Sequence, residues 1–439
     1  MRILAVLVLV TLCVGITSAS NIDYLTNRSV NYFRNFARNP ATDGADLVSY
    51  NPAGLVFLDE GFHISFGNQF LLKDYTIEAV PFWDTTSVET YESTEPTLFL
   101  PDLYAVYRTG DWAVFGAFTV PAGGGSLDYK EGLYVMPLLE TGYQQAINMS
   151  PYYFALMSEG SMKATSQYLA GTVGASFAAS DVFSFSLAGR YTSAKKVYDG
   201  QGDFTIFAPD STGIPVPVGT SSRVLEVEKT AAGFNGIISV DVVPVENLNI
   251  ALRYETSTAL EFETSVTQNG WIEAAIPVPL PDSSFAIDGF KQSRDLPAIL
   301  AGGVSYQFSP AFKLSTTFNY YCVEDIAEDS LNAIDVHYEN GLDIGLGIDY
   351  QVSPRILLGL SYLHSDLGGS DSTYNDFEYN LDYSAIGGGI RYAVNDNFAL
   401  TLAGGHNFYD EGQGVDLFDA CTYNKSVTYF GLGAEVSFR

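Results

Sequence analysis

The repeated stretch Tyr306-Gln-Phe-Ser-Pro-Ala-Phe-Lys-Leu314 decides the fold of this chain. Near copies follow at intervals of about forty residues, as Tyr350-Gln-Val-Ser-Pro-Arg-Ile-Leu-Leu358 and Tyr392-Ala-Val-Asn-Asp-Asn-Phe-Ala-Leu400. Each copy ends one strand at the Tyr, turns at Ser-Pro or Asn-Asp, and begins a new strand of alternating apolar residues. Because long polar segments separate these short turns, the pattern is typical of a transmembrane β-barrel of the outer membrane.

Three more short turns bring the total to six: Arg108-Thr-Gly-Asp111, Ala179-Ser-Asp181 and Val243-Pro-Val-Glu246. A strand leads into and out of each turn, which gives twelve, and strands near 61–72 and 426–438 raise the count to fourteen. The sequence therefore predicts an all-β, 14-stranded antiparallel transmembrane β-barrel whose short turns face the periplasm and whose long loops face outward. We expect strands of about 9–11 residues. The strands of a soluble β-sandwich or propeller would also alternate apolar and polar residues, but such a fold would not explain why short turns and long loops alternate along the chain.

The alternation within each strand assigns its two faces. In residues 183–191, Phe183, Phe185 and Leu187 alternate with Ser184 and Ser186, which indicates one apolar and one polar face. Aromatic residues just before short turns predict a girdle on the periplasmic side. These residues are Tyr107, Tyr306, Tyr350 and Tyr392.

Composition and the N-terminus support a membrane destination. Residues 1–19 resemble a secretory signal peptide, with Arg2, an apolar run and a small-residue cleavage site. A net charge of −30 argues against binding to nucleic acid, which requires clustered Lys and Arg. Acidic residues gather in the predicted loops, where solvation or weak binding of divalent cations are the alternatives. There is no Gly-x-Ser-x-Gly elbow and no paired metal-ligand motif, so we predict no enzyme, no cofactor and no metal.

The residues between the signal peptide and the first strand do not have a strand pattern. We divide the mature chain into a plug at 20–60 and a barrel at 61–439. The stretch Asn51-Pro52-Ala53-Gly has the residues of a tight turn, because Pro fixes φ and Gly relieves steric conflict. A barrel of fourteen strands would enclose an open aqueous channel, so we expect this segment to fold inward.

A plug that carries Asn51, Pro52 and Ala53, ahead of fourteen strands, resembles the FadL-type outer-membrane transporters of long-chain fatty acids and other hydrophobic compounds. The resemblance implies capture of cargo by outer loops, binding in the lumen, and sideways release into the membrane through a kink in the third strand. Here the third strand continues into Pro121-Ala-Gly-Gly-Gly-Ser126, and Pro and consecutive Gly both weaken strand pairing. Pro121, Gly123, Gly124 and Gly125 are therefore candidates for the lateral opening. The alternative is that they begin the next outer loop.

Arg190 and Arg253 are the candidate ligand-binding residues. Each lies in the middle of a strand on its polar face, and a fatty acid needs a cation for its carboxylate. The alternative is that they pair with acidic side chains of the lumen or the plug, because charges on barrel strands must avoid lipid. The predicted outer loops contain apolar clusters at 134–139, 149–157 and 271–280, which indicate either a binding surface or loops that pack together.

Cys322 and Cys421 both fall on the outer side, where the compartment permits a disulfide, although the sequence does not fix their separation. We thus predict a monomeric outer-membrane protein whose partners are membrane lipid and hydrophobic small molecules such as fatty acids or aromatic hydrocarbons. A general diffusion porin and a surface adhesin are the alternatives.

Overall fold

The computed structural model describes residues 28–80, 86–270, 287–325, 338–371, 373–374, 376, 379–415 and 420–438. The predicted signal peptide (1–19), the start of the predicted plug and the apolar loop cluster at 271–280 lie outside the described residues. None of the described helices is long and apolar enough to cross a membrane.

One antiparallel sheet closes on itself into a barrel, because its first strand, β1, pairs both with β3 and with the last strand, β18. Fourteen strands form the wall, which confirms the predicted fold class and strand number. They are β1 (Gly61–Ala79), β3 (Thr97–Thr109), β4 (Trp112–Tyr129), β5 (Phe154–Ala178), β6 (Phe183–Pro209), β7 (Pro215–Val245), β8 (Leu248–Glu255), β11 (Ala298–Ser309), β12 (Phe312–Cys322), β13 (Gly341–Ser353), β14 (Ile356–Asp366), β15 (Tyr383–Asn395), β16 (Phe398–Tyr409) and β18 (Ala420–Phe438).

Four short strands extend this wall at its long-loop end. β2 pairs with the last residues of β1, β9 pairs with the outer part of β7 and with β10, and β17 pairs with the first residues of β18. These strands are β2 (Glu89–Ser93), β9 (Glu261–Asn269), β10 (Lys291–Ser293) and β17 (Gly412–Val415).

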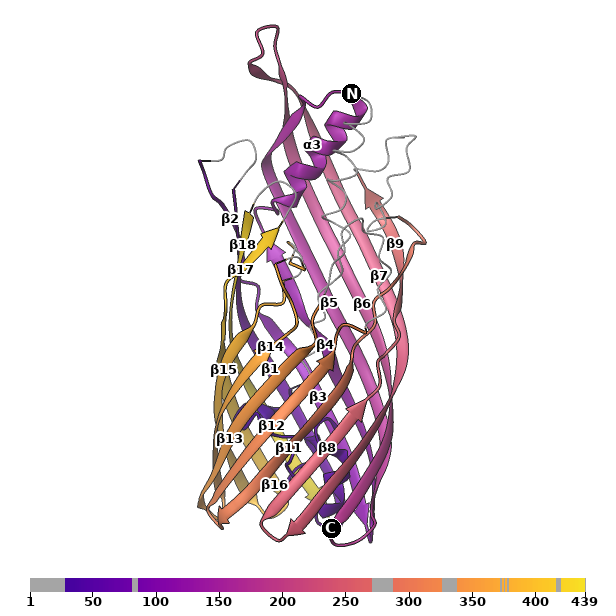
Figure 1. The fold of residues 1–439 in the computed structure, drawn as a ribbon, viewed down its shortest axis with the longest axis vertical. Coiled ribbons are helices and arrows are strands. Elements are labelled where there is room, and N and C mark those ends of the chain that lie inside the picture. The colour runs from indigo at the N-terminus through magenta and orange to yellow at the C-terminus, as the bar shows by residue number, and fades with distance from the viewer. Residues whose placement is uncertain are drawn as a thin grey trace.

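All six predicted short turns join strands at one end of the barrel, between β3 and β4, β5 and β6, β7 and β8, β11 and β12, β13 and β14, and β15 and β16. The expected strand length of about 9–11 residues is wrong for β1, β4 and β18, which have 19, 18 and 19 residues, and most of all for β5, β6 and β7, which have 25, 27 and 31. Their ladders continue far beyond the other strands, as a ribbon beside helix α3 (Val135–Ile147) (Figure 1). The thickness of the membrane sets only a minimum length for a strand, so the hydrogen-bond ladders between strands can continue beyond the membrane.

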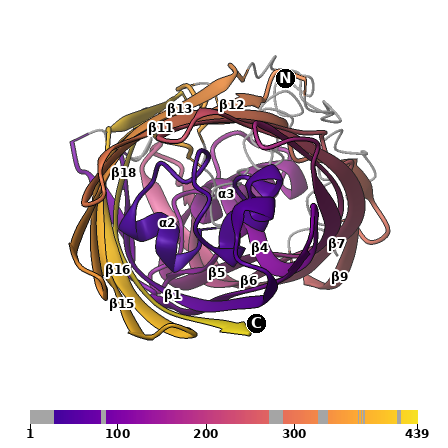
Figure 2. The ribbon, with the colours of Figure 1, turned by 90° about the horizontal axis from the view of Figure 1, so that it is seen from below.

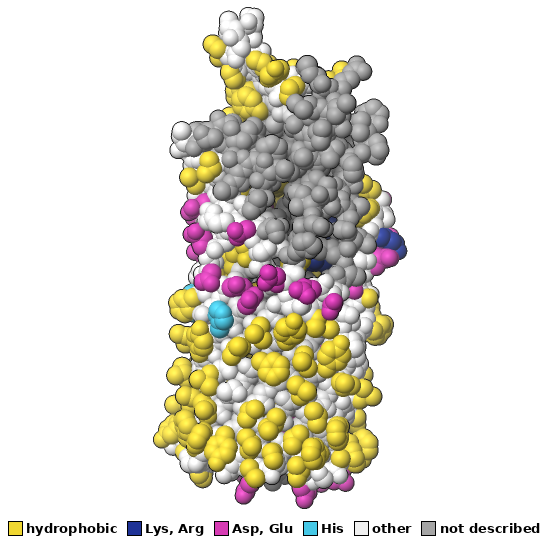
Figure 3. Space-filling model, viewed as in Figure 1, with side chains coloured by type: hydrophobic (Ala, Val, Ile, Leu, Met, Phe, Trp, Pro, Cys, Tyr) yellow, Lys and Arg dark blue, Asp and Glu magenta, His cyan; other side chains and the backbone are white. Residues whose placement is uncertain are grey.

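The apolar face of the wall points outward. On β6, Phe183 and Phe185 are half exposed, whereas Ser184 and Ser186 are buried. Figure 3 shows the consequence on one face of the molecule, where an apolar band covers the lower half of the barrel with acidic side chains above and below it. The four residues of the predicted aromatic girdle, Tyr107, Tyr306, Tyr350 and Tyr392, are 38–50% exposed beside the short turns.

The segment before β1 lies inside the barrel at the short-turn end, as predicted for a plug (Figure 2). It contains helix α2 (Val30–Arg34) and two 3-10 helices, η1 (Ala45–Val48) and η2 (Pro52–Phe57). Ser29 begins α2, because its Oγ accepts a hydrogen bond from the Tyr32 backbone N–H at 3.1 Å. The plug therefore fills the lower lumen and forms the floor of any cavity above it.

Candidate functional site

Asn51 holds the turn that follows η1. Its side-chain oxygen accepts a hydrogen bond from the Gly54 N–H at 3.3 Å and so begins η2. Its side-chain nitrogen donates to the Ala41 carbonyl at 2.9 Å and to the Asp241 carboxylate on β7. One buried amide thus joins two parts of the plug to the barrel wall, a role that Asn can fill because it both donates and accepts.

The next two residues of the motif bind the same side of the barrel through their backbones. The Pro52 carbonyl accepts a hydrogen bond from Ser176 Oγ on β5 at 2.6 Å. The Ala53 N–H donates to Ser239 Oγ on β7 at 2.9 Å, and the Ala53 carbonyl accepts from Ser184 Oγ on β6 at 2.8 Å. Asn51-Pro52-Ala53 is therefore the anchor of the plug on β5, β6 and β7.

Buried charges hold the earlier part of the plug. Arg38 donates to Asp43 and Asp46, both at 2.6 Å, and Arg34 pairs with Asp349 on β13. Both guanidinium groups are almost fully buried, so each requires its acidic partners. The plug is thus attached to the wall on the side of β5–β7 and also on the opposite side, at β13.

Glycines on the opposite wall let the plug backbone lie close to it. A Cβ atom on Gly359 of β14 would lie 2.6 Å from Arg34 Cγ, and one on Gly387 of β15 would lie 2.5 Å from Phe36 Cζ. Real Cβ contacts are not that short, so any other residue at either position would push the plug inward.

The third wall strand, β4, is interrupted where its sequence predicted. Among the described residues its pairing with β3 ends at Leu103 and Phe118, whereas its pairing with β5 continues to Tyr129. In the pairing with β5, register shifts lie on both sides of Ala122, between Thr119 and Gly125. Since the strand runs on to Tyr129, the alternative that residues 121–126 begin an outer loop is wrong.

The interruption depends on the predicted glycines. Gly123 and Gly125 have φ angles of 84° and 88°, which side chains rarely adopt, while Gly124 lies between them. Beyond this point the strand has other partners, because Ser126 accepts a hydrogen bond through its carbonyl from Lys73 Nζ of β1 at 2.6 Å. The outer half of β4 is thus no longer paired with β3 in the hydrogen-bond ladder, although the Thr97 side chain of β3 still lies against Gly125.

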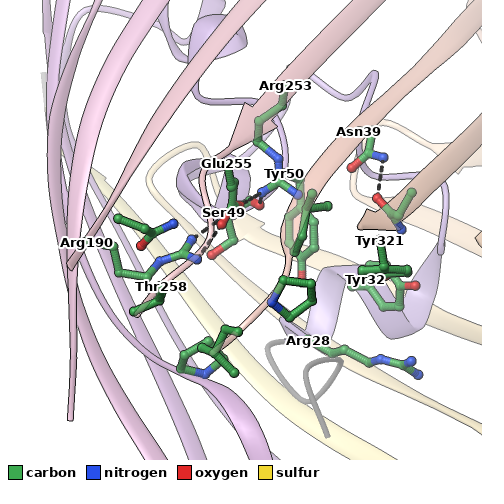
Figure 4. A pocket seen from close by; sticks show the side chains of 16 residues that line it. Arg28, Tyr32, Asn39, Ser49, Tyr50, Arg190, Arg253, Glu255, Thr258 and Tyr321 are labelled. Carbon is green, nitrogen blue, oxygen red and sulfur yellow. Dashed lines mark hydrogen bonds and ion pairs between the residues drawn. The ribbon is translucent and has the colours of Figure 1, made fainter. Parts of the chain in front are cut away.

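A cavity lies in the lumen between the plug and the interrupted strand (Figure 4). The predicted candidates Arg190, Arg253 and Pro121 all line it, so the structure brings together the ligand-binding and lateral-opening predictions. Arg28, Tyr32, Asn39, Ser49 and Tyr50 come from the plug side; Asn235, Glu255, Thr258, Leu296, Pro297, Ile299, Asn319 and Tyr321 complete the lining.

Arg190 and Arg253 share one carboxylate, that of Glu255 on β8. The Arg190 guanidinium lies 2.6 Å from Glu255 Oε2, and the Arg253 guanidinium lies 2.8 Å from Glu255 Oε1. The alternative prediction, that these arginines pair with an acidic side chain of the lumen, is therefore confirmed. Among the described residues that line the cavity, Arg28 is a third guanidinium group and Glu255 is the one carboxylate, while Asp343 lies just behind the lining and accepts a hydrogen bond from Tyr321 at 2.7 Å.

Two polar atoms of the lining have no hydrogen-bond partner among the described residues, Arg253 Nε and Asn235 Oδ1. Arg253 also donates to the Ser49 carbonyl of the plug, so it contacts the wall, the plug and the cavity at once. A buried donor without an acceptor costs free energy, and an anionic ligand would satisfy it.

The sequence did not single out Arg28 or Glu255. Glu255 follows Arg253 by two residues on the same strand, so strand periodicity alone places both on the inner face and could have found it. Arg28 donates to Tyr383 Oη at 2.6 Å and lies over the Tyr32 ring at 5.4 Å. No sequence signal distinguishes it from other plug residues.

Apolar side chains of the described residues form three clusters along the barrel interior, the lowest of which includes Leu47, Leu55 and Tyr104. The luminal cluster surrounds the plug and includes Phe33, Phe36, Tyr50, Tyr168, Leu260, Phe262, Tyr321, Tyr383, Val427 and Tyr429, with Leu71, Tyr75 and Tyr409 packed against it. The outer cluster lies under α3 and includes Ile77, Ala79, Tyr129, Tyr134, Met136, Leu138, Met162, Phe204, Tyr379, Cys421 and Tyr423, again with Tyr75 and Tyr409 against it. The predicted apolar segment 134–139 thus packs inside this outer cluster.

The two cysteines are not joined. No disulfide joins Cys322, at the end of β12, to Cys421, buried in the outer cluster, so the suggested disulfide is not present. β12 and β18 lie on separate parts of the wall with β13 to β16 between them, which explains the separation. Within the described residues no three His, Cys, Asp or Glu side chains could together hold a metal ion.

Solved structures share this architecture over nearly the whole chain. A FadL homologue from Pseudomonas aeruginosa superposes with a TM-score of 0.67, covering 96% of this chain and 100% of that one at 12% identity. The chain has the fold of the FadL-type transporters. The toluene transporters TodX of Pseudomonas putida and TbuX of Ralstonia pickettii superpose with TM-scores of 0.62 and 0.61 at 13% and 14% identity. They cover 91% and 94% of this chain and 96% and 98% of their own lengths.

No protein-family model matches the sequence, and no curated protein sequence matches it either. The FadL-type fold is thus recognised here from the architecture: a closed barrel of fourteen strands with its N-terminal segment inside. It is an outer-membrane fold, which agrees with the predicted location.

Proposed function

We propose that this protein passively transports long-chain fatty acids, or other hydrophobic molecules with an anionic head, across the outer membrane. The observation that carries the proposal is the luminal cavity. It has three arginines against one glutamate, an unpartnered donor on Arg253, and the interrupted strand β4 beside it.

Cargo would enter from the outer end. The outer cluster offers apolar and methionine side chains, which adapt to varied shapes and suit flexible hydrocarbon chains. Tyr75 and Tyr409 contact both clusters, so apolar surface continues from the outer loops down to the lumen. An alkyl chain following this path would bring its carboxylate to Arg28, Arg190 and Arg253.

Cargo would leave sideways. The plug closes the lower lumen through the contacts of Asn51 and Arg34, so a straight path to the periplasm is blocked. At Pro121–Gly125, β4 has separated from β3, and Pro121 itself lines the cavity. Release of the tail there would transfer the molecule directly to the hydrocarbon of the membrane, where its apolar surface is stable.

Aromatic hydrocarbons are the second candidate cargo. The rings of Tyr32, Tyr50 and Tyr321 line the cavity and could stack on a small aromatic molecule. Two of the similar structures are named as toluene transporters. The charged part of the lining favours an acid over a neutral ring, because a neutral ligand would leave Arg253 Nε unsatisfied.

The test is uptake of a labelled long-chain fatty acid, toluene and a small sugar by cells that lack their own fatty-acid transporter and major porins. Fatty-acid uptake without sugar flux is the expected result. Sugar flux alone would identify a diffusion porin, and no uptake of any of the three would favour an adhesin or structural barrel. Toluene uptake without fatty-acid uptake would assign the second candidate.

A further inference from the structure

Two buried polar side chains lie at the start of the gap between β3 and β4. The last pair of the β3–β4 ladder is Leu103 with Phe118, so Asp102 and Thr119 are the first residues beyond it on the two strands. Asp102 is 3% exposed and Thr119 is 1% exposed, whereas Leu103 and Phe118 are exposed on the outer face. Because successive residues of a strand point to opposite faces, Asp102 and Thr119 both point into the lumen.

Burial leaves polar atoms of both side chains without a hydrogen-bond partner among the described residues. These atoms are Asp102 Oδ2 and Thr119 Oγ1. The titratable groups that act on Asp102 are Asp46 and Tyr50 of the plug and Tyr104 of its own strand, and none of these three is a cation. A buried carboxyl group without a cation beside it is stable in its uncharged form, so Asp102 holds a proton.

β1 holds β3 in place beside the gap. The Asn68 side chain of β1 donates to the Leu98 carbonyl at 3.1 Å and accepts from the Leu100 N–H at 3.0 Å. Asp102 pairs in the ladder with Gly67, where a Cβ atom would lie 2.6 Å from Asp102 Oδ2. The missing side chain of Gly67 thus leaves room for the carboxyl group against the wall, on the side of the gap that stays attached.

The gap lies between the luminal cavity and the outer face of the wall. Pro121, two residues after Thr119 on β4, lines the cavity. At its upper end the gap stops where Thr97 of β3 lies against Gly125. A head group that leaves the cavity through the gap therefore passes Asp102 and Thr119.

We propose that Asp102 and Thr119 form an exit site that passes the head group of the cargo into the membrane as an uncharged acid. The proposal rests on the proposed transport of fatty acids. The carboxylate in the cavity is an anion, and burying an anion in hydrocarbon costs far more free energy than burying a protonated carboxyl group. The Asp102 carboxyl donates its proton to one oxygen of the cargo, while the Thr119 hydroxyl donates a hydrogen bond to the other.

The proton balance closes through water. The transfer breaks the O–H bond of Asp102 and forms an O–H bond on the cargo, which leaves Asp102 as a carboxylate and the fatty acid neutral. A hydronium ion from the water of the lumen then returns a proton to Asp102. One proton thus enters the membrane with each fatty acid, whereas an alcohol with the same tail needs no proton and does not depend on the exit site.

The experiment compares Asp102→Asn with Asp74→Asn as a matched control. Asn keeps the shape of the side chain but cannot transfer the proton, and Asp74 is exposed on the outer face of β1. Uptake of a labelled long-chain fatty acid is measured in cells without their own fatty-acid transporter, beside uptake of the alcohol with the same chain. Asp102→Asn should lower acid uptake about tenfold, the effect of one lost hydrogen bond to a charged group, and leave alcohol uptake unchanged.

Two variants of Thr119 test the other half of the exit site. Thr119→Val removes the hydroxyl at nearly constant volume and should lower acid uptake about fivefold, the effect of one neutral hydrogen bond. Thr119→Ser keeps the hydroxyl and should retain the uptake. The affinity of each purified variant for a fluorescent fatty acid should stay unchanged, because the arginines of the cavity still bind the head group.

Equal loss of acid and alcohol uptake in Asp102→Asn would overturn the exit site, since it would indicate a structural role. Higher acid uptake would also overturn it, because Asp102 would then be a carboxylate that repels acids. Unchanged acid uptake would remove the exit site alone, whereas no acid uptake by the unchanged protein would remove the transport proposal and the exit site together. Heat-modifiable migration on gels checks that each variant is a folded barrel.

Discussion

Changing Arg253 and Glu255 separately should alter fatty-acid affinity in opposite directions. Arg253→Met removes a cavity cation and its unpartnered Nε, while Glu255 keeps its 2.6 Å pair with Arg190. Glu255→Gln instead removes the carboxylate that competes with the ligand for both guanidinium groups. A fatty-acid head should therefore bind Arg253→Met more weakly and Glu255→Gln more tightly than the unchanged protein.

The expected size follows from the contacts. A hydrogen bond to a charged group contributes about 1.5–3 kcal/mol, which corresponds to a loss of about 10- to 100-fold in affinity for Arg253→Met. Stability should follow a different order. Arg190 and Glu255 are 7% and 3% exposed, so Glu255→Gln leaves two buried guanidinium groups without their counter-charge and should cost about 3–5 kcal/mol. Arg253→Met should cost less, because Arg190 still neutralises Glu255.

Both quantities can be measured on purified protein in detergent. Displacement of a fluorescent fatty acid gives the affinity, and the urea dependence of heat-modifiable migration gives the stability. The reasoning requires Glu255→Gln to be the least stable variant and yet the tightest binder. If both variants bind more weakly, the arginines serve only the internal ion pair, and the cavity does not select acids.

Three further changes test the plug and the cysteines. Asn51→Ala removes the contacts with Gly54, Ala41 and Asp241, so small-sugar flux should rise while the barrel stays heat-modifiable; no rise in flux would contradict the anchor role. Gly359→Leu should raise the same flux because its side chain meets Arg34, whereas Gly189→Leu on β6, where a Cβ atom would meet nothing within 4 Å, is the matched control and should leave the flux unchanged. Cys322→Ser should leave the migration of the protein on gels without reductant unchanged, because Cys322 forms no disulfide. A change in migration would show that the predicted disulfide with Cys421 does form.

The fold could be predicted because the turns and the alternation are local signals. Each Ser-Pro or Asn-Asp turn fixes two strand ends, and Phe183 and Ser184 reveal their faces without knowledge of any neighbour. The length of β5, β6 and β7 could not be predicted in this way. There the hydrogen-bond ladders continue above the membrane, because each strand pairs with the next one. How far a strand extends thus depends on the length of its neighbour, which the sequence of that strand alone does not show.

The site could be predicted only in part. Strand parity placed Arg190 and Arg253 in the lumen, and Pro and Gly marked the interruption at 121–125. The sharing of Glu255 and the approach of Arg28 depend on how three strands and the plug meet in space. The suggested disulfide between Cys322 and Cys421 failed for the same reason, since lying on one side of the membrane does not bring two strands together.

Arg253 gives a physical reason for ligand binding and plug position to influence one another. Its guanidinium donates to the Ser49 carbonyl of the plug and also faces the cavity. A carboxylate that pairs with Arg253 weakens the contact with Ser49, and by linkage a plug whose Ser49 has moved away from Arg253 leaves that guanidinium a better partner for the ligand. Asn51, two residues later, stays bound to β7 through Asp241. Because Arg34 is bound to Asp349 on β13, movement driven by the ligand should therefore be confined to the residues near Ser49, while the anchor on β5–β7 stays in place.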